Sequence, residues 1–256
     1  MKHKTKVILS LFFILFLLTS IISHRYILAL ISFILVASYI YIQDYYRANI
    51  HAISSLTSSN NIEIIEQNHV IYFIPKNPTK GLIFYPGAKV EATAYAPLLK
   101  KCSEEGILCA LVKMPFHLAV LKINGADGIQ KQYPNVKSWY IGGHSLGGAM
   151  AAFYLSKHLS EYDGFILLAS YSTKDLSSSN KKVLSIRVSN DDILNKRAYQ
   201  RNKKNLPINY QEYMIEGGCH SYFGSYGSQD GDGIPTISNR EQIQKASSII
   251  SSFINQ

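Results

Sequence analysis

Two stretches without charge dominate the start of the chain. Residues 7–23 (VILSLFFILFLLTSIIS) and 26–42 (YILALISFILVASYIYI) are apolar, and only His24 and Arg25 separate them. Each stretch has 17 residues and would form a helix about 25 Å long, near the minimum for crossing a hydrocarbon core of about 30 Å. Neither shows the polar face of a helix on a soluble domain. The pattern predicts a membrane anchor over residues 1–42, with two short transmembrane helices favoured over one.

The basic residues around these stretches bear on the orientation of the anchor. Lys2, Lys4 and Lys6 precede the first stretch, and such flanks favour the cytoplasmic side of a membrane. Two spans then return the rest of the chain to the cytoplasm, whereas one span leaves it outside the cell. Arg25, at the outer turn, speaks against two spans. A signal peptide is a third interpretation, but the apolar run is long and no small-residue cleavage site follows it.

Beyond the anchor, short apolar runs alternate with helical stretches. Residues 43–61 are polar and serine-rich, which is typical of a linker or an early surface helix. Residues 62–256 form one predicted domain, and several of its strand candidates are apolar throughout, as happens when helices cover both faces of a sheet. This alternation predicts an α/β fold with a mostly parallel sheet. Strands are expected at 70–74, 82–85, 107–112, 138–142, 164–168, 183–188 and 210–215, and helices at 92–105, 126–132, 146–158, 197–203 and 239–254.

The net charge of the 256-residue chain is +9, which raises the question of an anionic partner. Lys2, Lys4, Lys6 and Arg25 lie in the anchor, so only about +5 remains over the other residues. No basic stripe with interleaved aromatic residues stands out, and binding to nucleic acid is not expected. The three cysteines are widely spaced and match neither a disulfide scaffold nor a metal site. We predict no cofactor and no metal; protein partners are not indicated.

Residues 143–147 read GHSLG and lie between a predicted strand and a predicted helix. A G-x-S-x-G motif in this setting is typical of a nucleophilic serine held on a sharp turn. The glycines leave room for backbone that passes close to them. The helix that begins at Leu146 directs the positive end of its dipole toward the serine. A glycine-rich turn with a chance serine is the alternative, which the flanking strand and helix disfavour, so we predict that Ser145 is a nucleophile.

A serine hydroxyl needs a base to accept its proton, and that base needs a carboxylate to orient it. Among eight histidines, His220 follows a late predicted strand in the sequence GGCH and is the preferred base, with His117 as second choice. The carboxylate is expected after the preceding strand, where Asp191 is preferred over Asp192. The order along the chain is then serine, aspartate, histidine, which is one of the known orders of such triads.

An oxyanion hole requires two backbone amides aimed at the developing charge. Leu146, which directly follows the proposed nucleophile, supplies one in our prediction. The other is expected from the loop after the strand at 82–85, which reads PGAK over residues 86–89. Ala88 is the preferred donor in that loop and Lys89 the second choice, although an ordinary turn would also explain the sequence. His144, inside the serine motif, is expected to point away from the site.

Together these features resemble the α/β-hydrolase superfamily, and more narrowly a bacterial family of small membrane-tethered α/β hydrolases near the dienelactone hydrolases. The matching segments fall within about residues 80–235: FYPGAKVEATAYAPLLKKC, VKMPFHLAVL, IGGHSLGGAMAAFYLSKH, SNDD and EGGCHSYFGSYGSQDGDG. The resemblance implies an α/β-hydrolase fold and a catalytic triad of Ser145, Asp191 and His220. This chain departs from the family in its second apolar stretch, because members usually have one span, and in Cys219, where a polar residue is expected. Dienelactone hydrolases proper use a cysteine nucleophile, so their substrate is not carried over.

The expected activity is hydrolysis of an ester or a related acyl bond in a small molecule, at a lipid bilayer. Residues 169–182 (ASYSTKDLSSSNKK) are too few for a large lid domain, so we predict a shallow or open pocket with rims from residues 114–121 and 221–232. Acyl transfer to an acceptor other than water, with the same triad, is one alternative. A non-catalytic binding protein on a hydrolase scaffold is the other, because a fold does not fix a function.

Overall fold

The computed structural model describes residues 2–256, which divide into a first unit that ends at Asp44 and a second, Tyr45–Gln256. The first unit is a single helix, α1 (Lys2–Gln43). His24 and Arg25 are helical, so the turn predicted between two short helices is absent. Residues 2–43 contain neither glycine nor proline, the residues that most readily interrupt a helix. This composition explains why α1 is continuous.

Part of α1 is apolar enough to cross a membrane. Within the described part of the chain, the segment Thr19–Gln43 has 25 residues and a mean hydropathy of 2.0. At 1.5 Å per residue this segment is roughly 38 Å long, which exceeds a hydrocarbon core of about 30 Å. A signal sequence near the N-terminus passes the same test. The helix therefore indicates a membrane span or a signal sequence.

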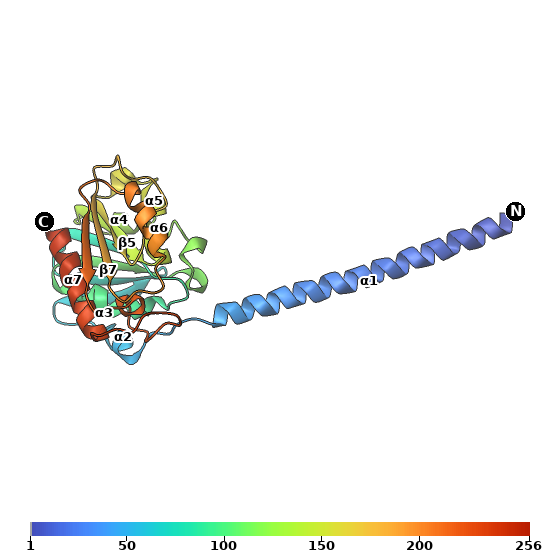
Figure 1. Ribbon diagram of the computed structural model, residues 1–256, viewed down its shortest axis with the longest axis horizontal. Coiled ribbons are helices and arrows are strands. Elements are labelled where there is room, and N and C mark those ends of the chain that lie inside the picture. The colour runs from blue at the N-terminus through green and yellow to red at the C-terminus, as the bar shows by residue number, and fades with distance from the viewer. Residues whose placement is uncertain (1) are drawn as a thin grey trace. The chain divides into compact units, whose positions relative to one another are not determined.

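A sheet of eight strands forms the centre of the second unit (Figure 1). The strand order is β1-β2-β4-β3-β5-β6-β7-β8. β2 is antiparallel to β1 and β4, and the remaining neighbours are parallel, which confirms the mostly parallel sheet. The strands are β1 (Ile62–Gln67), β2 (Val70–Pro75), β3 (Lys80–Tyr85), β4 (Ile107–Val112), β5 (Ser138–His144), β6 (Gly164–Leu168), β7 (Lys182–Val188) and β8 (Gln211–Ile215).

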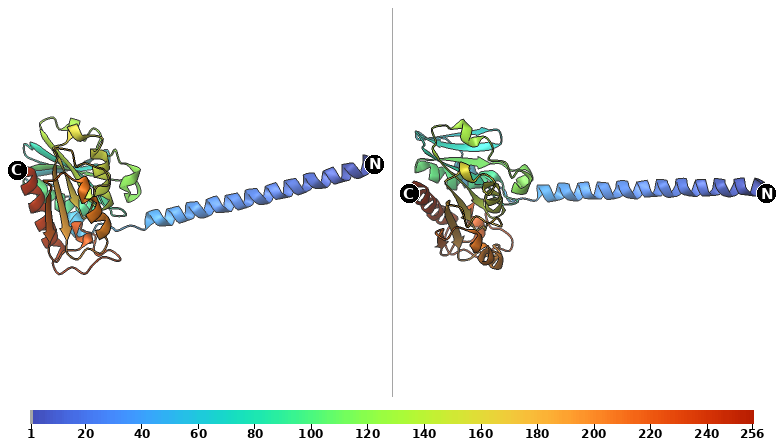
Figure 2. Two further views of the ribbon diagram at one scale, coloured as in Figure 1. Left: turned by 45° about the horizontal axis from the view of Figure 1, so that its top comes forward. Right: turned by 90° about the horizontal axis from the view of Figure 1, so that it is seen from above.

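Helices cover both faces of this sheet. α3 (Ala96–Glu104) and α7 (Asn239–Asn255) lie on one face and α5 (Leu146–Leu155) on the other. Figure 2 shows the two ends of the sheet, light blue strands at one and orange strands at the other, on opposite sides of the domain. The shorter helices are α2 (Ile50–Ser54), α4 (Ile129–Gln132), α6 (Lys196–Asn202), η1 (Ala92–Tyr95), η2 (Pro115–His117), η3 (Ala119–Leu121), η4 (Leu159–Glu161), η5 (Lys203–Asn205) and η6 (His220–Phe223).

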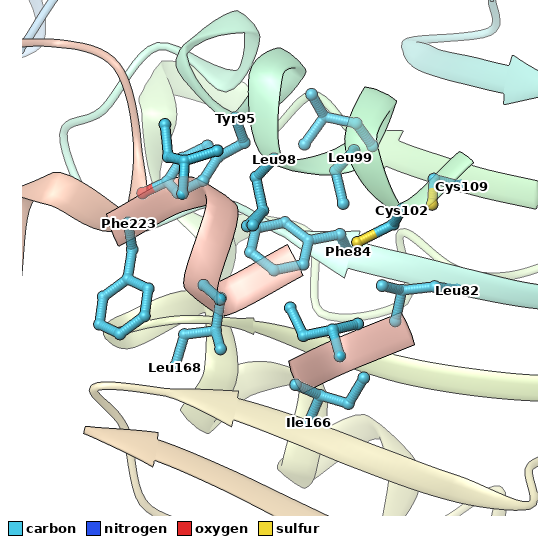
Figure 3. Packing of buried hydrophobic residues seen from close by; sticks show 14 of the residues in the cluster. Leu82, Phe84, Tyr95, Leu98, Leu99, Cys102, Cys109, Ile166, Leu168 and Phe223 are labelled. Atoms are coloured by element: carbon cyan, nitrogen blue, oxygen red, sulfur yellow. The ribbon is translucent and has the colours of Figure 1, made fainter. Parts of the chain in front are cut away.

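Successive residues of the inner strands enter two separate cores. Leu82 and Phe84 of β3 face α3 and α7, whereas Ile83 and Tyr85 face α5. Figure 3 shows the first of these cores, in which side chains of α3 pack over Phe84. All four strand residues have no exposed surface, and full burial of such a side chain is worth roughly 1.5–3 kcal/mol. Burial on both faces explains why these strands are apolar throughout.

The predicted elements match the observed ones closely. The strands predicted at 107–112 and 164–168 have the observed bounds of β4 and β6. The helix predicted over 92–105 is divided into η1 and α3, because Pro97 stands at the start of α3. β1 is missing from the prediction. Its sequence, IEIIEQ, is half polar and belongs to an edge strand with an exposed side.

Candidate active site

β3 and β5 are neighbours at the point where the strand order reverses. The chain moves from β3 to β4 on one side, and β5 lies on the other side of β3. In open α/β sheets, ligands bind beyond the carboxyl ends of the strands at such a point. Tyr85 at the end of β3 pairs with Gly143 of β5. The loop at residues 86–89 and Ser145 therefore leave the sheet from adjoining strand ends.

Ser145 occupies a strained turn between β5 and α5. Its backbone angles are φ 52° and ψ −124°, a region that costs a residue other than glycine about 1–3 kcal/mol. Two hydrogen bonds hold it there: the Ser145 amide donates to the Leu168 carbonyl oxygen at 2.9 Å, and the Ser170 hydroxyl donates to the Ser145 carbonyl oxygen at 2.7 Å. The end of β6 and the residues after it therefore hold the serine in the sharp turn that its motif predicts.

The glycines of the motif are required by the close approach of the β3 exit. A Cβ on Gly143 would lie 2.5 Å from the Tyr85 carbonyl oxygen. A Cβ on Gly147 would collide with the carbonyl oxygens of both Tyr85 and Pro86. Real Cβ atoms do not tolerate such contacts, because protein interiors are close-packed. The motif thus fixes the distance between the serine turn and the loop at residues 86–89.

His220 and Asp191 form a buried pair at the ends of β8 and β7. The Nδ1 atom of His220 lies 2.9 Å from Oδ2 of Asp191, and both side chains are at most 3% exposed. The second oxygen, Oδ1, accepts hydrogen bonds from the amides of Ile193 at 2.9 Å and Leu194 at 2.7 Å. Three partners thus stabilise a carboxylate that would otherwise be costly to bury. With Nδ1 donating to Asp191, Nε2 of His220 is left as the acceptor.

The backbone around His220 is held by two further side chains. Asp232 accepts from the amide of His220 at 3.2 Å and from the amide of Ser221 at 2.8 Å. Gln242 of α7 accepts from the amide of Cys219 at 3.0 Å and donates to its carbonyl oxygen at 2.9 Å. The segment after β8 that carries the histidine is therefore held by hydrogen bonds on both sides.

The loop at residues 86–89 has one amide without a partner among the residues that the structure describes. Pro86 has no N–H group, the Gly87 amide donates to the Tyr95 hydroxyl at 3.0 Å, and the Lys89 amide donates to the His117 carbonyl oxygen at 2.9 Å. No hydrogen bond is found for the amide of Ala88, or for that of Leu146 at the start of α5. These two amides are the ones that the sequence predicts as oxyanion donors, and both are available for a ligand.

A cavity of about 360 Å³ opens at Ser145 and His220. Its other lining residues come from the start of α5 and from the loops after β6 and β7: Leu146, Ala149, Met150, Ala169, Ser170, Tyr171, Thr173, Ile193, Leu194 and Asn195. The rims predicted at residues 114–121 and 221–232 do not line it. The two predicted rims leave the sheet at the same edge as Ser145. The loops after β6 and β7 lie nearer to this serine, because β6 is the strand next to β5.

The described part of the chain contains no group of three or more His, Cys, Asp or Glu side chains that could hold a metal ion. His220 and Asp191, which lie close together, are bonded to each other and to backbone amides.

A family model described as the alpha/beta hydrolase family matches residues 81–244. The chain belongs to the α/β hydrolase family. The match runs from β3 into the start of α7 and includes Ser145, Asp191 and His220. None of the curated proteins compared with the chain matches it.

Solved structures share the fold of this α/β hydrolase at low sequence identity. TT1662 from Thermus thermophilus is 12% identical with a TM-score of 0.57, over 76% of this chain and 99% of that one. Est1E from Butyrivibrio proteoclasticus is 13% identical with a TM-score of 0.55, over 77% and 100%. A dienelactone hydrolase from Anabaena variabilis is 11% identical with a TM-score of 0.58, over 76% and 97%. At these identities the likeness shows the fold, whereas the family match confirms the resemblance to the α/β-hydrolase superfamily.

His144 in this α/β hydrolase was expected to point away from the site, but it lies beside His220. Its buried ring lies beside that of His220, with centroids 4.4 Å apart, and its Nδ1 atom is 2.8 Å from the Tyr95 hydroxyl. Burial, followed by the nearby His220, lowers the pKa of His144 well below its ordinary value. Tyr95 also accepts from the Gly87 amide. A neutral His144 and Tyr95 thus connect the loop after β3 to the histidine of the site.

His117 and Cys219, the two other residues that the sequence singled out near the site, take structural positions. His117 stacks on Tyr45 with ring centroids 4.0 Å apart and does not line the cavity. The Sγ atom of Cys219 is buried 3.3 Å from the Ser221 hydroxyl, and burial is the main cause that raises its pKa to about 11. A thiol with such a pKa is a poor nucleophile, so Cys219 contributes packing.

Proposed function

We propose that this α/β hydrolase is a serine hydrolase that cleaves an ester or a related acyl bond through an acyl-enzyme. The buried bond of 2.9 Å between His220 and Asp191, next to a cavity that His220 shares with the strained Ser145, is the observation that carries the proposal. A binding protein would have no need of a buried carboxylate behind a histidine that faces its ligand. Such a carboxylate is costly to bury, and its position behind the histidine is typical of acid–base catalysis.

The proposed mechanism assigns one step to each group. The Ser145 hydroxyl oxygen attacks the carbonyl carbon of the substrate, and its proton passes to Nε2 of His220. Asp191 keeps the imidazole in the required tautomer and stabilises the imidazolium cation. The amides of Leu146 and Ala88 donate to the oxyanion. His220 then protonates the leaving group, and a water molecule, activated by the same histidine, releases the acyl group from Ser145.

The cavity favours a substrate with a neutral acyl group of modest size. Ala149, Met150, Ile193 and Leu194 supply apolar surface, and the lining residues that the structure describes include no Lys, Arg, Asp or Glu. A volume of about 360 Å³ lies at the lower end of the usual range of ligand sites, roughly 300–1,000 Å³. Carboxylated or phosphorylated acyl groups would enter without a cationic partner, so neutral esters are the preferred substrates.

The triad is tested by the hydrolysis of p-nitrophenyl esters with acyl chains of increasing length. We expect the full chain to hydrolyse short esters best, and Ser145→Ala to lower kcat by at least roughly 10⁴-fold. Ser178→Ala is the matched control, because Ser178 is an exposed serine in the connection between β6 and β7, and it should keep the original rate. Equal hydrolysis by the Ser145→Ala variant would show that Ser145 is not the nucleophile.

We also propose that residues 1–42 anchor the enzyme in a membrane. The apolar segment Thr19–Gln43 supports this, as do the lysines at its N-terminal side. The full chain should remain in the membrane fraction after alkaline carbonate washing, and a chain that begins at residue 43 should be released. Release of the full chain would exclude the anchor. A reporter fused after Gln256 distinguishes the sides, with a cytoplasmic signal expected for two spans and an external signal for one.

A further inference from the structure

The loop at residues 115–121, between β4 and α4, exposes three large apolar side chains. Phe116 is 55% exposed, Val120 44% and Leu121 55%. They lie on the two turns η2 and η3, whose inner residue Ala119 is buried. Single exposed apolar residues are ordinary, but three within six positions of one loop form a local apolar surface. We call these three side chains the apolar surface of the 115–121 loop.

This loop is held in a fixed conformation. Phe116 and His117 have φ angles of 51° and 59°, and each such residue costs about 1–2 kcal/mol. The Lys89 amide donates to the His117 carbonyl oxygen at 2.9 Å, and the Leu118 amide donates to Pro115 at 3.0 Å. Contacts with the domain therefore maintain a strained loop that keeps Phe116 outside, although burial of this side chain would be worth roughly 1.5–3 kcal/mol.

The chain segment that enters the domain after α1 is packed against this loop. The Tyr45 ring stacks on His117 at 4.0 Å, and the Tyr46 amide donates to the Lys89 carbonyl oxygen at 2.7 Å. Only Asp44 separates Gln43, the last residue of α1, from Tyr45 in the sequence. The first residues of the second unit therefore pack beside the 115–121 loop.

Basic side chains flank the apolar surface. Lys122 follows Leu121 directly, and the guanidinium group of Arg47 lies 4.7 Å from the centre of the Tyr45 ring. Burial is the main cause that lowers the pKa of His117. The charge of Glu91 raises this pKa, and the charges of Arg47 and Lys113 lower it. Lys113 also pairs with Glu66. Apolar side chains flanked by lysine and arginine are typical of segments that lie in the headgroup region of a bilayer.

We propose that Phe116, Val120 and Leu121 insert into the lipid–water interface of the membrane that holds α1, with Arg47 and Lys122 at the headgroups, and that the ester substrate is an amphiphile drawn from that interface. The part of this inference that concerns substrate rests on the proposed function. The 115–121 loop contacts Lys89, the neighbour of the proposed oxyanion donor Ala88. Insertion would therefore bring the edge of the sheet that carries Ser145 toward the lipid.

The test of insertion uses single cysteines in the full chain. The three native cysteines are buried, so a thiol-reactive NBD fluorophore would report an introduced Phe116→Cys. Ile208→Cys is the matched control, because Ile208 is 101% exposed. Ile208 precedes β8 and the 115–121 loop follows β4, so the two positions lie at opposite ends of the parallel strands. Both variants are compared in detergent and in vesicles of equimolar phosphatidylcholine and phosphatidylglycerol.

Insertion predicts that NBD at residue 116 becomes several-fold brighter in the vesicles and is quenched by lipids that carry a quencher in their acyl chains, whereas NBD at residue 208 is unaffected. Identical spectra and quenching at the two positions would overturn the proposal. Partial quenching at residue 116 that disappears without phosphatidylglycerol would support it and assign the attraction to the basic residues, since such attraction depends on anionic lipid.

Activity separates this inference from the proposed function. A variant with Phe116→Ser, Val120→Ser and Leu121→Ser should hydrolyse a soluble short ester at the original rate, because these residues do not line the cavity. Its rate on an ester embedded in the vesicles should fall about tenfold. Equal rates of the variant and the original protein on the embedded ester would overturn delivery from the interface. If the original protein hydrolyses neither ester, the proposed function fails, while the fluorescence still decides insertion.

Discussion

Asp191 and its neighbour Asp192 differ in their burial and in their partners. It stands at the end of β7, its Oδ2 atom contacts His220, and its Oδ1 atom accepts from two amides of the following turn. Asp192, the neighbouring carboxylate, is exposed and pairs with Lys196 at 3.2 Å. The two residues are therefore adjacent in sequence but chemically different, and they offer a direct comparison.

We predict that Asp191→Asn lowers kcat on a short ester by roughly 10³–10⁴-fold, because the amide would favour the wrong tautomer of His220. Asp192→Asn should change kcat less than twofold. Steady-state kinetics of both variants, with circular dichroism to verify folding, provide the measurement. Similar losses in the two variants would remove Asp191 from its proposed role.

The sequence was sufficient to predict where the strand order places the three proposed triad residues. Ser145, Asp191 and His220 each follow a strand that the apolar runs mark, so the parallel topology brings them to one edge. Tyr95 and Asp232 were not predicted, although both hold parts of the site. They act across distances in the chain that no local pattern encodes. A tyrosine in a helical stretch and an aspartate in a glycine-rich loop have many ordinary explanations.

At the scale of elements, the contact between the serine turn and the exit of β3 determines the site. The glycine at position 147 lies against the carbonyl oxygens of Tyr85 and Pro86. Gly106, by comparison, has a φ of +84° and open space around its Cα. A side chain at position 147 would therefore collide with neighbouring backbone, whereas at position 106 only the positive φ angle disfavours a side chain.

We predict that Gly147→Ala destabilises the domain by about 3 kcal/mol, since overpacking against backbone cannot relax easily. It should also lower kcat at least tenfold, because the loop with Ala88 would move. Gly106→Ala should cost about 1–2 kcal/mol for its left-handed backbone and keep the original kcat. Urea unfolding and ester kinetics of both variants give the answer, and full activity of Gly147→Ala would contradict the proposed position of the oxyanion donors.

β7, β8 and α6 are joined by an ionic cluster around Glu212. Its carboxylate accepts from Arg187 at 2.7 Å, from Lys203 at 2.7 Å and from the Tyr199 hydroxyl at 2.8 Å. Burial raises the pKa of Glu212, but the bonds from Lys203, Tyr199 and Arg187 outweigh burial and lower the pKa from 4.5 to about 2. The folded state thus binds the proton less tightly than the unfolded state.

This depressed pKa predicts how stability changes with pH. The contribution of Glu212 is complete above about pH 4.5 and is lost as the pH falls toward about 2, because the unfolded chain takes up the proton first. Glu212→Gln should therefore reduce the fall in Tm of residues 43–256 over this interval. Glu216→Gln, an exposed glutamate just beyond β8, is the control and should leave the fall unchanged. An unaltered acid profile in the Glu212 variant would contradict the assignment.

At the scale of the whole molecule, the apolar pattern predicted the two parts of the chain but not the continuity of the first. The boundary between the units at Asp44 lies close to the predicted end of the anchor at residue 42. A polar pair within an apolar run resembles a turn in sequence, yet His24 and Arg25 are compatible with a helix, and α1 continues through them. The number of spans and the side of the membrane stay predictions.

The catalytic proposal depends on Ser145 being an activated nucleophile, and covalent labelling tests this most directly. The full chain would be treated with a fluorophosphonate probe, digested, and the modified peptide identified by mass spectrometry. We predict an adduct on Ser145, its loss in Ser145→Ala, and its retention in Ser178→Ala. An adduct on another serine, or equal labelling of the Ser145→Ala variant, would contradict the account.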